Sequence, residues 1–334
     1  MDGKRTVCVT GASGYIGSWL VMRLLERRYH VRATIKDPGN EKVKHLLELA
    51  NASTHLTLWK ADLDEESSYD DAFQGCEGVF HVAAPMELLF QDQATKEDTE
   101  SATILNGLLN VMRSCSKTKT LKRFIYTSTT GTIIMQPQPP LHEYTENLWS
   151  DVDFCYDSKM HGWKYLAAKT VAEKAAWKYA EENGIDMVTV HPSLVFGHFI
   201  TPYRGYSIDI AISLYTKDKA AMASLKCLNG TSIVHLDDVC NAHIYLFEHP
   251  LAKGRYICST HTLNIFEIAH SLSLKYPDRD ITTEFETLDK SLKIVPCSSE
   301  KLLGIGFEFS HKNKGENWVV CFFTSLLKRT NISR

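Results

Sequence analysis

Short apolar runs alternate with amphipathic stretches over the first two hundred residues of the chain. Stretches such as 18–28 and 99–115 place apolar residues at the spacing of one helix face. Parallel strands need crossover helices that cover both faces of their sheet. The pattern therefore predicts an α/β fold with a doubly wound parallel sheet of the Rossmann type. The six runs with the composition of buried strands lie at 5–11, 30–35, 56–61, 78–83, 123–128 and 186–192.

Composition and charge narrow the class of protein. Hydrophobic residues make up 44% of the 334 residues and charged residues 23%, as in ordinary globular domains. The net charge of −3 gives no electrostatic reason to expect a nucleic acid as partner. The nine cysteines are scattered and form no CxxC pair, so we expect reduced thiols and no metal site. Without a signal-peptide pattern or a run of about 18 apolar residues, we expect a cytoplasmic protein with no membrane span.

A glycine-rich segment, VTGASGYIGSWL, follows the first expected strand and opens the first expected helix. Its glycines Gly11, Gly14 and Gly17 have the spacing GxxGxxG. The first permits a tight turn, the second lets the backbone approach a pyrophosphate, and the third lets helix and strand pack closely. The phosphates then lie at the helix N-terminus, where free N–H groups favour anions. Between a strand and a helix, this triplet indicates a dinucleotide-binding loop rather than a structural turn.

The residues after the second expected strand distinguish the two nicotinamide dinucleotides. An acidic residue there binds the ribose 2′-hydroxyl of NAD, whereas basic residues accommodate the 2′-phosphate of NADP. Lys36 and Lys42 lie at this place, so we expect NADPH; the alternative is that both lysines are only solvated charges. Asp62 follows the third strand, where its carboxylate can accept from the adenine amino group. The small-residue backbone of HVAAP (81–85) is expected beside the dinucleotide, with His81 as a packed strand residue.

The alternation of strands and helices weakens past the sixth expected strand. We expect residues 1–196 and 233–253 to form an NADPH-binding Rossmann domain, because the later segment has the pattern of an element that packs back on the sheet. Residues 197–232 and 254–334 are expected to form a smaller C-terminal substrate-binding lobe.

A second motif supplies the chemistry. Tyr165 and Lys169 lie four residues apart in the helical stretch WKYLAAKTVAEK, so they share one helix face. A tyrosine with its ordinary pKa of about 10 is a poor acid, and the lysine charge is expected to lower that pKa. The lysine is also expected to bind the nicotinamide ribose, while a hydroxyl from YTSTTGT (126–132) orients a substrate carbonyl. This arrangement suits hydride addition to a carbonyl with a proton from Tyr165.

These motifs and several longer segments resemble the plant dihydroflavonol 4-reductase family of the extended short-chain dehydrogenases/reductases. The longer segments are VCVTGASGYIGSWLVMRLLERRYHVRAT, GCEGVFHVAAPM, VAEKAAWKYAEENGID and VHLDDVCNAHIYLFEHP. The resemblance implies an NADPH-dependent oxidoreductase of flavonoid biosynthesis that reduces the C4 ketone of dihydroflavonols to leucoanthocyanidins, and that also accepts flavanones. It also implies a small aromatic carbonyl substrate and a loose association with other pathway enzymes.

The resemblance assigns roles to single residues. It implies catalytic roles for Tyr165 and Lys169, and for Thr129, which occupies the place of the family's catalytic serine, with Ser128 as a neighbouring candidate. His191 is expected to be a buried strand residue. The cofactor contacts implied by the loop, the strand ends and the family are Gly11, Ser13, Gly14, Tyr15, Ile16, Gly17, Lys36, Lys42, Asp62, Leu63, Val82, Ala83, Ala84, Thr127, Tyr165, Lys169, Pro192, Leu194 and Val195.

One departure from the family's pattern bears on the substrate. Ile134 occupies the place of an Asn or Asp that contacts hydroxyls of the flavonoid B-ring; Met86 and Tyr165 are the other expected substrate contacts. Because an isoleucine cannot hydrogen-bond a hydroxyl, a less hydroxylated ring or a different carbonyl compound stays open. Two alternatives follow: a reductase of another aromatic ketone or aldehyde, of the vestitone, anthocyanidin or phenylacetaldehyde type, and a non-catalytic dinucleotide-binding regulator.

Overall fold

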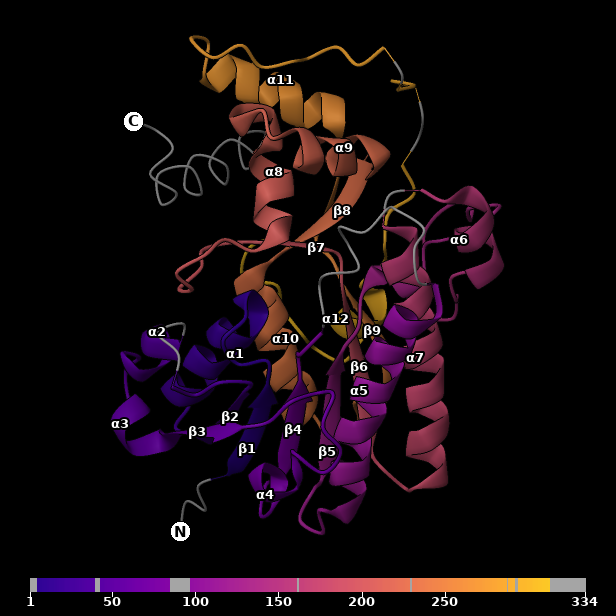
Figure 1. The fold of residues 1–334 in the computed structure, drawn as a ribbon. Helices are drawn as coiled ribbons and strands as arrows, with labels where there is room; N and C mark the ends of the chain where they lie inside the picture. The colour runs from indigo at the N-terminus through magenta and orange to yellow at the C-terminus, as the bar shows by residue number, and fades with distance from the viewer. Residues whose placement is uncertain are drawn as a thin grey trace.

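The large sheet of the molecule is parallel throughout, as the computed structural model in Figure 1 shows. The described residues are 5–39, 43–84, 97–160, 162–228, 230–286, 288–291 and 294–312. Seven strands follow one another in the order β3-β2-β1-β4-β5-β6-β9, and every neighbouring pair is parallel. The predicted doubly wound sheet is therefore confirmed. The strand bounds are β1 Thr6–Thr10, β2 His30–Ile35, β3 Leu56–Lys60, β4 Gly78–His81, β5 Arg123–Thr127, β6 Met187–Pro192 and β9 Gly254–Cys258.

Helices cover both faces of this sheet, because parallel strands can be joined only by crossovers. Helices α1 and α10 pack against each other on one face, and α5 and α7 on the other. The short helix α6 packs on α7, and α12 lies against β9. The bounds are α1 Tyr15–Glu26, α2 Lys44–Leu47, α3 Ala52–His55, α4 Asp70–Phe73, α5 Glu97–Lys117, α6 Val152–Ser158, α7 Trp163–Glu182, α10 Leu236–Glu248 and α12 Glu300–Gly304.

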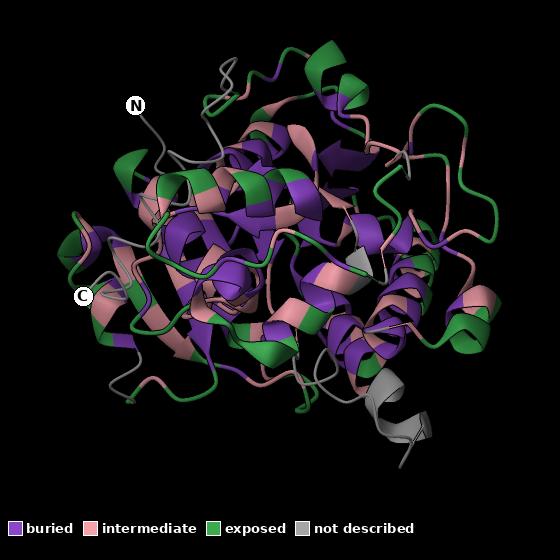
Figure 2. Cartoon of the chain, turned by 90° about the horizontal axis from the view of Figure 1, so that it is seen from above, coloured by how far each residue is buried: buried purple, intermediate pink, exposed green. Residues whose placement is uncertain are grey.

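Alternation along β5 shows how one strand serves two cores. Ile125 belongs to the apolar cluster that includes Leu20 of α1, whereas Phe124 and Tyr126 belong to the cluster that includes Ala172 of α7. Successive side chains of a strand point to opposite faces, so a strand covered on both sides is apolar at every position. Seen from above in Figure 2, the buried residues accordingly gather in the sheet and on the inner sides of its helices.

A second, smaller sheet lies beyond the carboxyl ends of the large one (Figure 1). Its order is β10-β8-β7, with β7 parallel and β10 antiparallel to β8. Helices α8, α9 and α11 accompany it and share an apolar cluster of their own with its strands. Its elements are β7 Leu194–Phe196, α8 Tyr206–Thr216, α9 Lys219–Leu228, β8 Gly230–His235, β10 His261–Asn264 and α11 Ile265–Lys275, and a 3-10 turn, η3, spans Thr130–Thr132 of the other lobe.

The position of strand β9 differs from the one that the predicted domain division gave it. That division assigned everything from residue 254 onward to the smaller lobe, but β9 pairs with β6 from Gly254 to Cys258 as the seventh strand of the large sheet. The run GRYIC is apolar enough for the core of either lobe, so its composition does not reveal which sheet it joins. Helix α10 does pack back on the large sheet, as expected. The division as a whole stays a prediction.

The described part of the chain contains no helix that is long and apolar enough to cross a membrane. Within the same residues, no group of three or more His, Cys, Asp or Glu side chains is arranged to hold a metal ion.

Candidate active site

The glycine loop joins β1 to α1 at the carboxyl edge of the sheet. Gly11 has φ of +64°, and a Cβ there would lie 2.7 Å from the backbone Cα of Ala83, so both conformation and space demand glycine. The N–H of Gly14 donates to the carbonyl of Gly11 at 3.0 Å. Helix α1 begins after Gly14 without a side-chain cap and without an acidic residue in its first turn. Its first N–H groups are therefore suited to an anionic group.

Thr10 ties this loop to the end of β4. Its hydroxyl accepts from the backbone N–H groups of Val82 and Ala83 at 3.2 and 3.3 Å, and is 2.8 Å from Nδ1 of His81. His81 is a buried strand residue, as expected. The predicted contacts in the glycine loop and at the end of β4 are thus neighbours in space.

The connection between β7 and α8 contacts the glycine loop from the smaller lobe. Tyr203 donates to the carbonyl of Ser13 at 2.9 Å, and Tyr15 donates to the carbonyl of Gly197 at 3.3 Å. A Cβ at Gly205 would lie 2.9 Å from the ring of Tyr15. The connection between β7 and α8 therefore packs against the segment predicted to hold phosphates.

Two of the predicted cofactor residues form an ion pair at the far edge of the sheet. Lys36 Nζ lies 2.8 Å from Asp62 Oδ2, and 74% of the lysine side chain is exposed. The hydrogen bond from Lys36 lowers the pKa of Asp62 although burial acts in the opposite direction, and it raises the pKa of Lys36. The structure thus places these two predicted residues side by side. Lys42 lies outside the described residues.

The predicted acid pair lies on α7 where the helix passes the end of β5. Lys169 is only 2% exposed, and Tyr165 packs at the edge of the apolar cluster between α7 and the sheet. Lys169 Nζ donates hydrogen bonds to Tyr126 Oη at 2.7 Å and to the carbonyl of Thr127 at 3.2 Å. The pair is therefore beside the Ser/Thr-rich segment, as predicted from the spacing.

The pKa values of this pair differ from the prediction. Burial raises the pKa of Tyr165 to about 12. Burial also lowers the pKa of Lys169 to about 8, although the charge of Glu173 acts in the opposite direction. The predicted lowering of the tyrosine pKa is wrong for this structure, because the ammonium group is directed at Tyr126 and Thr127 and because burial disfavours the phenolate.

The two candidate hydroxyls after β5 have different surroundings. Ser128 is buried and donates to Glu173 Oε2 at 2.6 Å. Thr129 is partly exposed, and its hydroxyl oxygen accepts from the N–H of Gly131 at 3.1 Å; among the described residues no acceptor takes its proton. Thr127 directs its hydroxyl to His243 of α10 at 2.7 Å, so its contact with Lys169 is made by the backbone. Thr129 is therefore the hydroxyl that can still donate.

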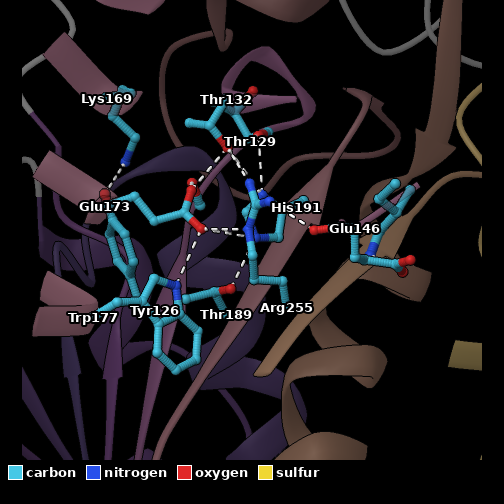
Figure 3. Close-up of polar contacts among 12 residues, drawn as sticks. Tyr126, Thr129, Thr132, Glu146, Lys169, Glu173, Trp177, Thr189, His191 and Arg255 are labelled. Atoms are coloured by element: carbon cyan, nitrogen blue, oxygen red, sulfur yellow. Dashed lines mark hydrogen bonds and ion pairs between the residues drawn. The ribbon is translucent and has the colours of Figure 1, made fainter. Parts of the chain in front are cut away.

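Glu173 was not predicted from the sequence. Its side chain is fully buried one turn after Lys169, and Figure 3 shows the donors converging on it. Burial alone would raise the pKa of this carboxylate, but contacts with His191, Arg255 and Ser128 hold that pKa far below its ordinary value. The spacing YxxxKxxxE was the available signal, since it continues one helix face. The donors are Ser128 Oγ at 2.6 Å, Thr132 Oγ1 at 2.8 Å, Arg255 Nε at 2.9 Å and Trp177 Nε1 at 3.4 Å, and His191 Nε2 lies 3.2 Å from the same carboxylate.

Arg255 extends this network from β9 to the segment before α6. Its Nη1 donates to the carbonyls of Glu146 and Leu148 at 2.7 and 2.6 Å, and its Nη2 donates to Thr132 Oγ1 at 3.1 Å. The guanidinium group lies 3.7 Å from the ring centroid of Trp149. One side chain thus fixes both the turn that follows Thr129 and the loop beside it (Figure 3).

His191 is fully buried, as expected, at the end of β6. Its Nδ1 lies 3.1 Å from the carbonyl of Thr129, an acceptor, while its Nε2 faces Glu173 and lies 2.8 Å from Thr189 Oγ1. The imidazole thus links the carboxylate to the backbone of the predicted catalytic threonine.

The predicted substrate residue Ile134 lies between two small apolar clusters. It packs with Met135 and Trp163 on one side and with Tyr144 on the other. An apolar side chain among apolar neighbours offers no hydrogen bond to a ligand. Met86, the other predicted substrate contact, lies outside the described residues.

The end of β6 carries a buried hydroxyl that nothing in the described chain satisfies. Ser193 lies between Pro192 and Leu194, both predicted to contact the cofactor, and its Oγ has no hydrogen-bond partner among the described residues. An orphaned buried hydroxyl is rare in folded proteins. Ser193 was not predicted from the sequence.

Comparison with known proteins decides the family. A sequence model of the NAD dependent epimerase/dehydratase family matches residues 7–265. The chain belongs to this family. Among the curated members, dihydroflavonol 4-reductase of Arabidopsis thaliana is 51% identical over 92% of this chain and 79% of its own length. The bifunctional dihydroflavonol 4-reductase/flavanone 4-reductase of Malus domestica is 51% identical over 92% of this chain and 87% of its own.

Solved structures similar to this chain have the same architecture. Vestitone reductase from alfalfa is 34% identical, with a TM-score of 0.79 and coverage of 98% of this chain and 99% of that one. A yeast methylglyoxal/isovaleraldehyde reductase, solved in complex with NADPH, is 21% identical with a TM-score of 0.78 over 98% and 99% of the two chains; it shows the fold alone. The predicted resemblance is confirmed. The family uses a nicotinamide dinucleotide as cofactor, and the similar reductases place the chain among the oxidoreductases.

Within the family's fold, the structure brings most of the predicted residues to one edge of the sheet. The glycine loop, the end of β4 and the acid pair on α7 all meet the carboxyl ends of β1, β4 and β5. In open parallel sheets, ligands bind outside these ends, at the point where strand order reverses; here the order reverses between β1 and β4. The individual roles stay predictions.

Proposed function

We propose that the chain is an NADPH-dependent carbonyl reductase that reduces the C4 ketone of dihydroflavonols, and of flavanones, to the alcohol. The observation that carries this is the arrangement of Tyr165, Lys169 and Thr129 at the carboxyl end of β5, in a chain about half identical over most of its length to dihydroflavonol 4-reductases. A regulator without activity would have no need of this set, so we do not favour it.

The residues present fit a dinucleotide. The glycine loop leaves no room for a Cβ at Gly11 and opens on the N-terminus of α1, and the buried hydroxyl of Ser193 has no partner among the described residues. Tyr15 and Ile16 would hold the pyrophosphate through their N–H groups, and Gly14, which has no side chain, would leave room for it. Lys36, exposed at the end of β2, would bind the 2′-phosphate, which is the basis for choosing NADPH. When bound, this cofactor supplies a hydride to the carbonyl carbon.

The chain's own residues would act on the carbonyl oxygen. Thr129 would donate a hydrogen bond to it, which orients the carbonyl and stabilises the charge that develops. Tyr165, whose pKa is raised to about 12, keeps its proton until that oxygen becomes strongly basic and then transfers it. Lys169 would bind the ribose hydroxyls and so hold the cofactor in place.

Ile134 favours a second candidate substrate. Its surroundings are apolar on both sides, so a ring with few hydroxyls would be bound at least as well as a catechol. A different aromatic ketone or aldehyde is therefore the alternative substrate. The cytoplasmic location and the loose association with other pathway enzymes stay predictions.

The test is consumption of NADPH by purified protein with dihydrokaempferol, dihydroquercetin, naringenin and simple aromatic aldehydes side by side. Reduction of the dihydroflavonols supports the proposal, and turnover of the aldehydes alone supports the alternative. Tyr165→Phe is expected to lower kcat by about 1,000-fold or more and to leave the Kd for NADPH within about threefold. Tyr179→Phe, on the same helix, is the matched control, because its hydroxyl lies at the exposed contact with Ser116. Full turnover in Tyr165→Phe would refute the assignment of the acid.

A further inference from the structure

Tyr126 makes two kinds of contact with the ammonium group of Lys169. Its side chain is 1% exposed at the end of β5. Lys169 Nζ donates to its phenol oxygen at 2.7 Å, and the same nitrogen lies 4.5 Å from the centroid of its ring. A buried ammonium group is costly unless acceptors surround it. Tyr126 supplies an oxygen and a π face, and the carbonyl of Thr127 supplies a further acceptor at 3.2 Å.

The titratable groups that face Lys169 come from three elements. Glu173 lies on its own helix, Tyr126 lies on β5, and His81 lies on β4. Burial, and after it the charge of Lys169, lowers the pKa of His81 to about 3, so its ring is neutral where it stacks on Tyr126. Burial raises the pKa values of Tyr126 and Tyr165, so both phenols are neutral. Glu173 is therefore the anion of this group, and Tyr126 the neutral acceptor.

We propose that Tyr126 is a positioning residue that holds the Lys169 ammonium group at the carboxyl end of β5 and keeps it charged for its work. The motif YxxxK defines the lysine but says nothing of the strand that receives it. The inference rests on the proposed function for the task of Lys169, which is to bind the ribose of the cofactor. Tyr126 acts through the lysine, whose ammonium group donates to its phenol oxygen.

Tyr126→Phe tests this, because it removes one oxygen and keeps the ring that fills the core. The readout is the Kd of the whole protein for NADPH, followed by energy transfer from tryptophan between about pH 6 and about pH 10. In the wild type, affinity should fall as Lys169 loses its proton. Loss of a hydrogen bond to a charged group shifts the pKa of that group, here Lys169, by about one unit or more. We expect the fall in affinity to begin about one pH unit lower in the variant.

Tyr256→Phe is the matched control. Tyr256 is also 1% exposed, its phenol oxygen accepts from the N–H of Lys253 at 3.0 Å, and the Nζ of Lys301 lies 4.3 Å from its ring. The same atom is thus deleted from a buried tyrosine beside another lysine. Its thermal stability should fall by as much as that of Tyr126→Phe, while its pH profile should coincide with the wild type.

A double variant keeps the inference open to refutation by a second route. In a Lys169→Met background, Tyr126→Phe should leave the Kd unchanged, because the group through which it acts is gone. A Tyr126→Phe profile that coincides with the wild type, or an equal loss of affinity in the Lys169→Met background, would overturn the inference. The measurement needs no carbonyl substrate, so a protein that binds NADPH but reduces nothing would refute the proposed function and still decide on Tyr126.

Discussion

Two opposite charges are buried one turn apart on α7, and they are satisfied to very different degrees. Glu173 is fully buried and receives donors from α7 itself, from both ends of the segment after β5, and from strands β6 and β9. Lys169, nearly as buried, donates to one phenol and one backbone carbonyl of β5. The difference appears in the pKa values: that of Glu173 lies far below its ordinary range, while burial lowers that of Lys169 to about 8.

This difference separates a structural charge from a working one. The carboxylate is held by so many donors that it fixes the turn carrying Thr129. The ammonium group has fewer partners, and its pKa is close to neutral, so a ligand that offers oxygens can compete for it. Substitutions at Glu173, at the two hydroxyls after β5 and at Lys169 test this difference.

The largest effect is expected from Glu173→Gln. The amide NH2 of glutamine is a donor and cannot accept the hydrogen bonds that one carboxylate oxygen of Glu173 now accepts. Arg255 would also keep its charge without a carboxylate beside it. Breaking a buried pair by removing one partner costs about 3–5 kcal/mol. We expect the free energy of unfolding, measured in urea at neutral pH, to fall by this amount.

Glu182→Gln is the control for that variant. Glu182 lies on the same helix, its side chain is 59% exposed, and its partner Lys178 is 3.9 Å away. An exposed pair of this kind contributes about 0–1 kcal/mol. Equal losses in the two variants would show that the Glu173 network has no special part in stability.

A smaller effect separates the two hydroxyls after β5. Thr129→Val is expected to lower kcat by about 100-fold, because it removes the donor to the carbonyl oxygen while keeping the shape of the side chain. Ser128→Ala is expected to lower stability by about 1–3 kcal/mol, since it removes a donor to the buried carboxylate. Its kcat should stay within about threefold of the wild type. If Ser128→Ala lost kcat and Thr129→Val kept it, the assignment of the two hydroxyls would be reversed.

The fold could be predicted because its signals are local. Each of the six predicted strands overlaps a strand of the large sheet, and the stretches 18–28 and 99–115 correspond to α1 and α5. Their apolar runs are bounded by turns, and burial on both faces leaves one consistent pattern. β9 was placed in the wrong lobe because the sheet a buried strand joins depends on the whole path of the chain, which composition does not record.

The site could be predicted only as far as its motifs extend. Gly11 and the pair Tyr165 and Lys169 each belong to a spacing with a physical reason. Glu173 and Arg255 are 82 residues apart in the chain, and no local pattern announces that they meet. The error on the tyrosine pKa has the same origin, because burial depends on packing from β5 and α5 that the spacing of α7 does not contain.

The smallest expected effect is a gain in stability, from Lys169→Met. Lys169→Met is expected to raise the free energy of unfolding by about 1–2 kcal/mol near pH 7, because the folded protein no longer holds a charge that burial disfavours. The gain is smaller than the pKa difference alone would give, since Tyr126 and Thr127 lose a donor. Stability would thus oppose the role proposed for this residue.

The sign of its pH dependence is fixed by the direction of the shift. The folded wild type releases the Lys169 proton at a pH of about 8, whereas the unfolded chain keeps it up to the ordinary value of 10.5. Between these values the unfolded state binds more protons, so the wild type gains stability as the pH rises. The advantage of Lys169→Met should therefore be complete below about pH 8 and fade toward pH 10 in urea titrations. Lys178→Met, whose side chain is 78% exposed on the same helix, should change stability by less than about 0.5 kcal/mol at either pH. An advantage that persisted undiminished at high pH would mean that Lys169 is not the poorly satisfied charge of the pair.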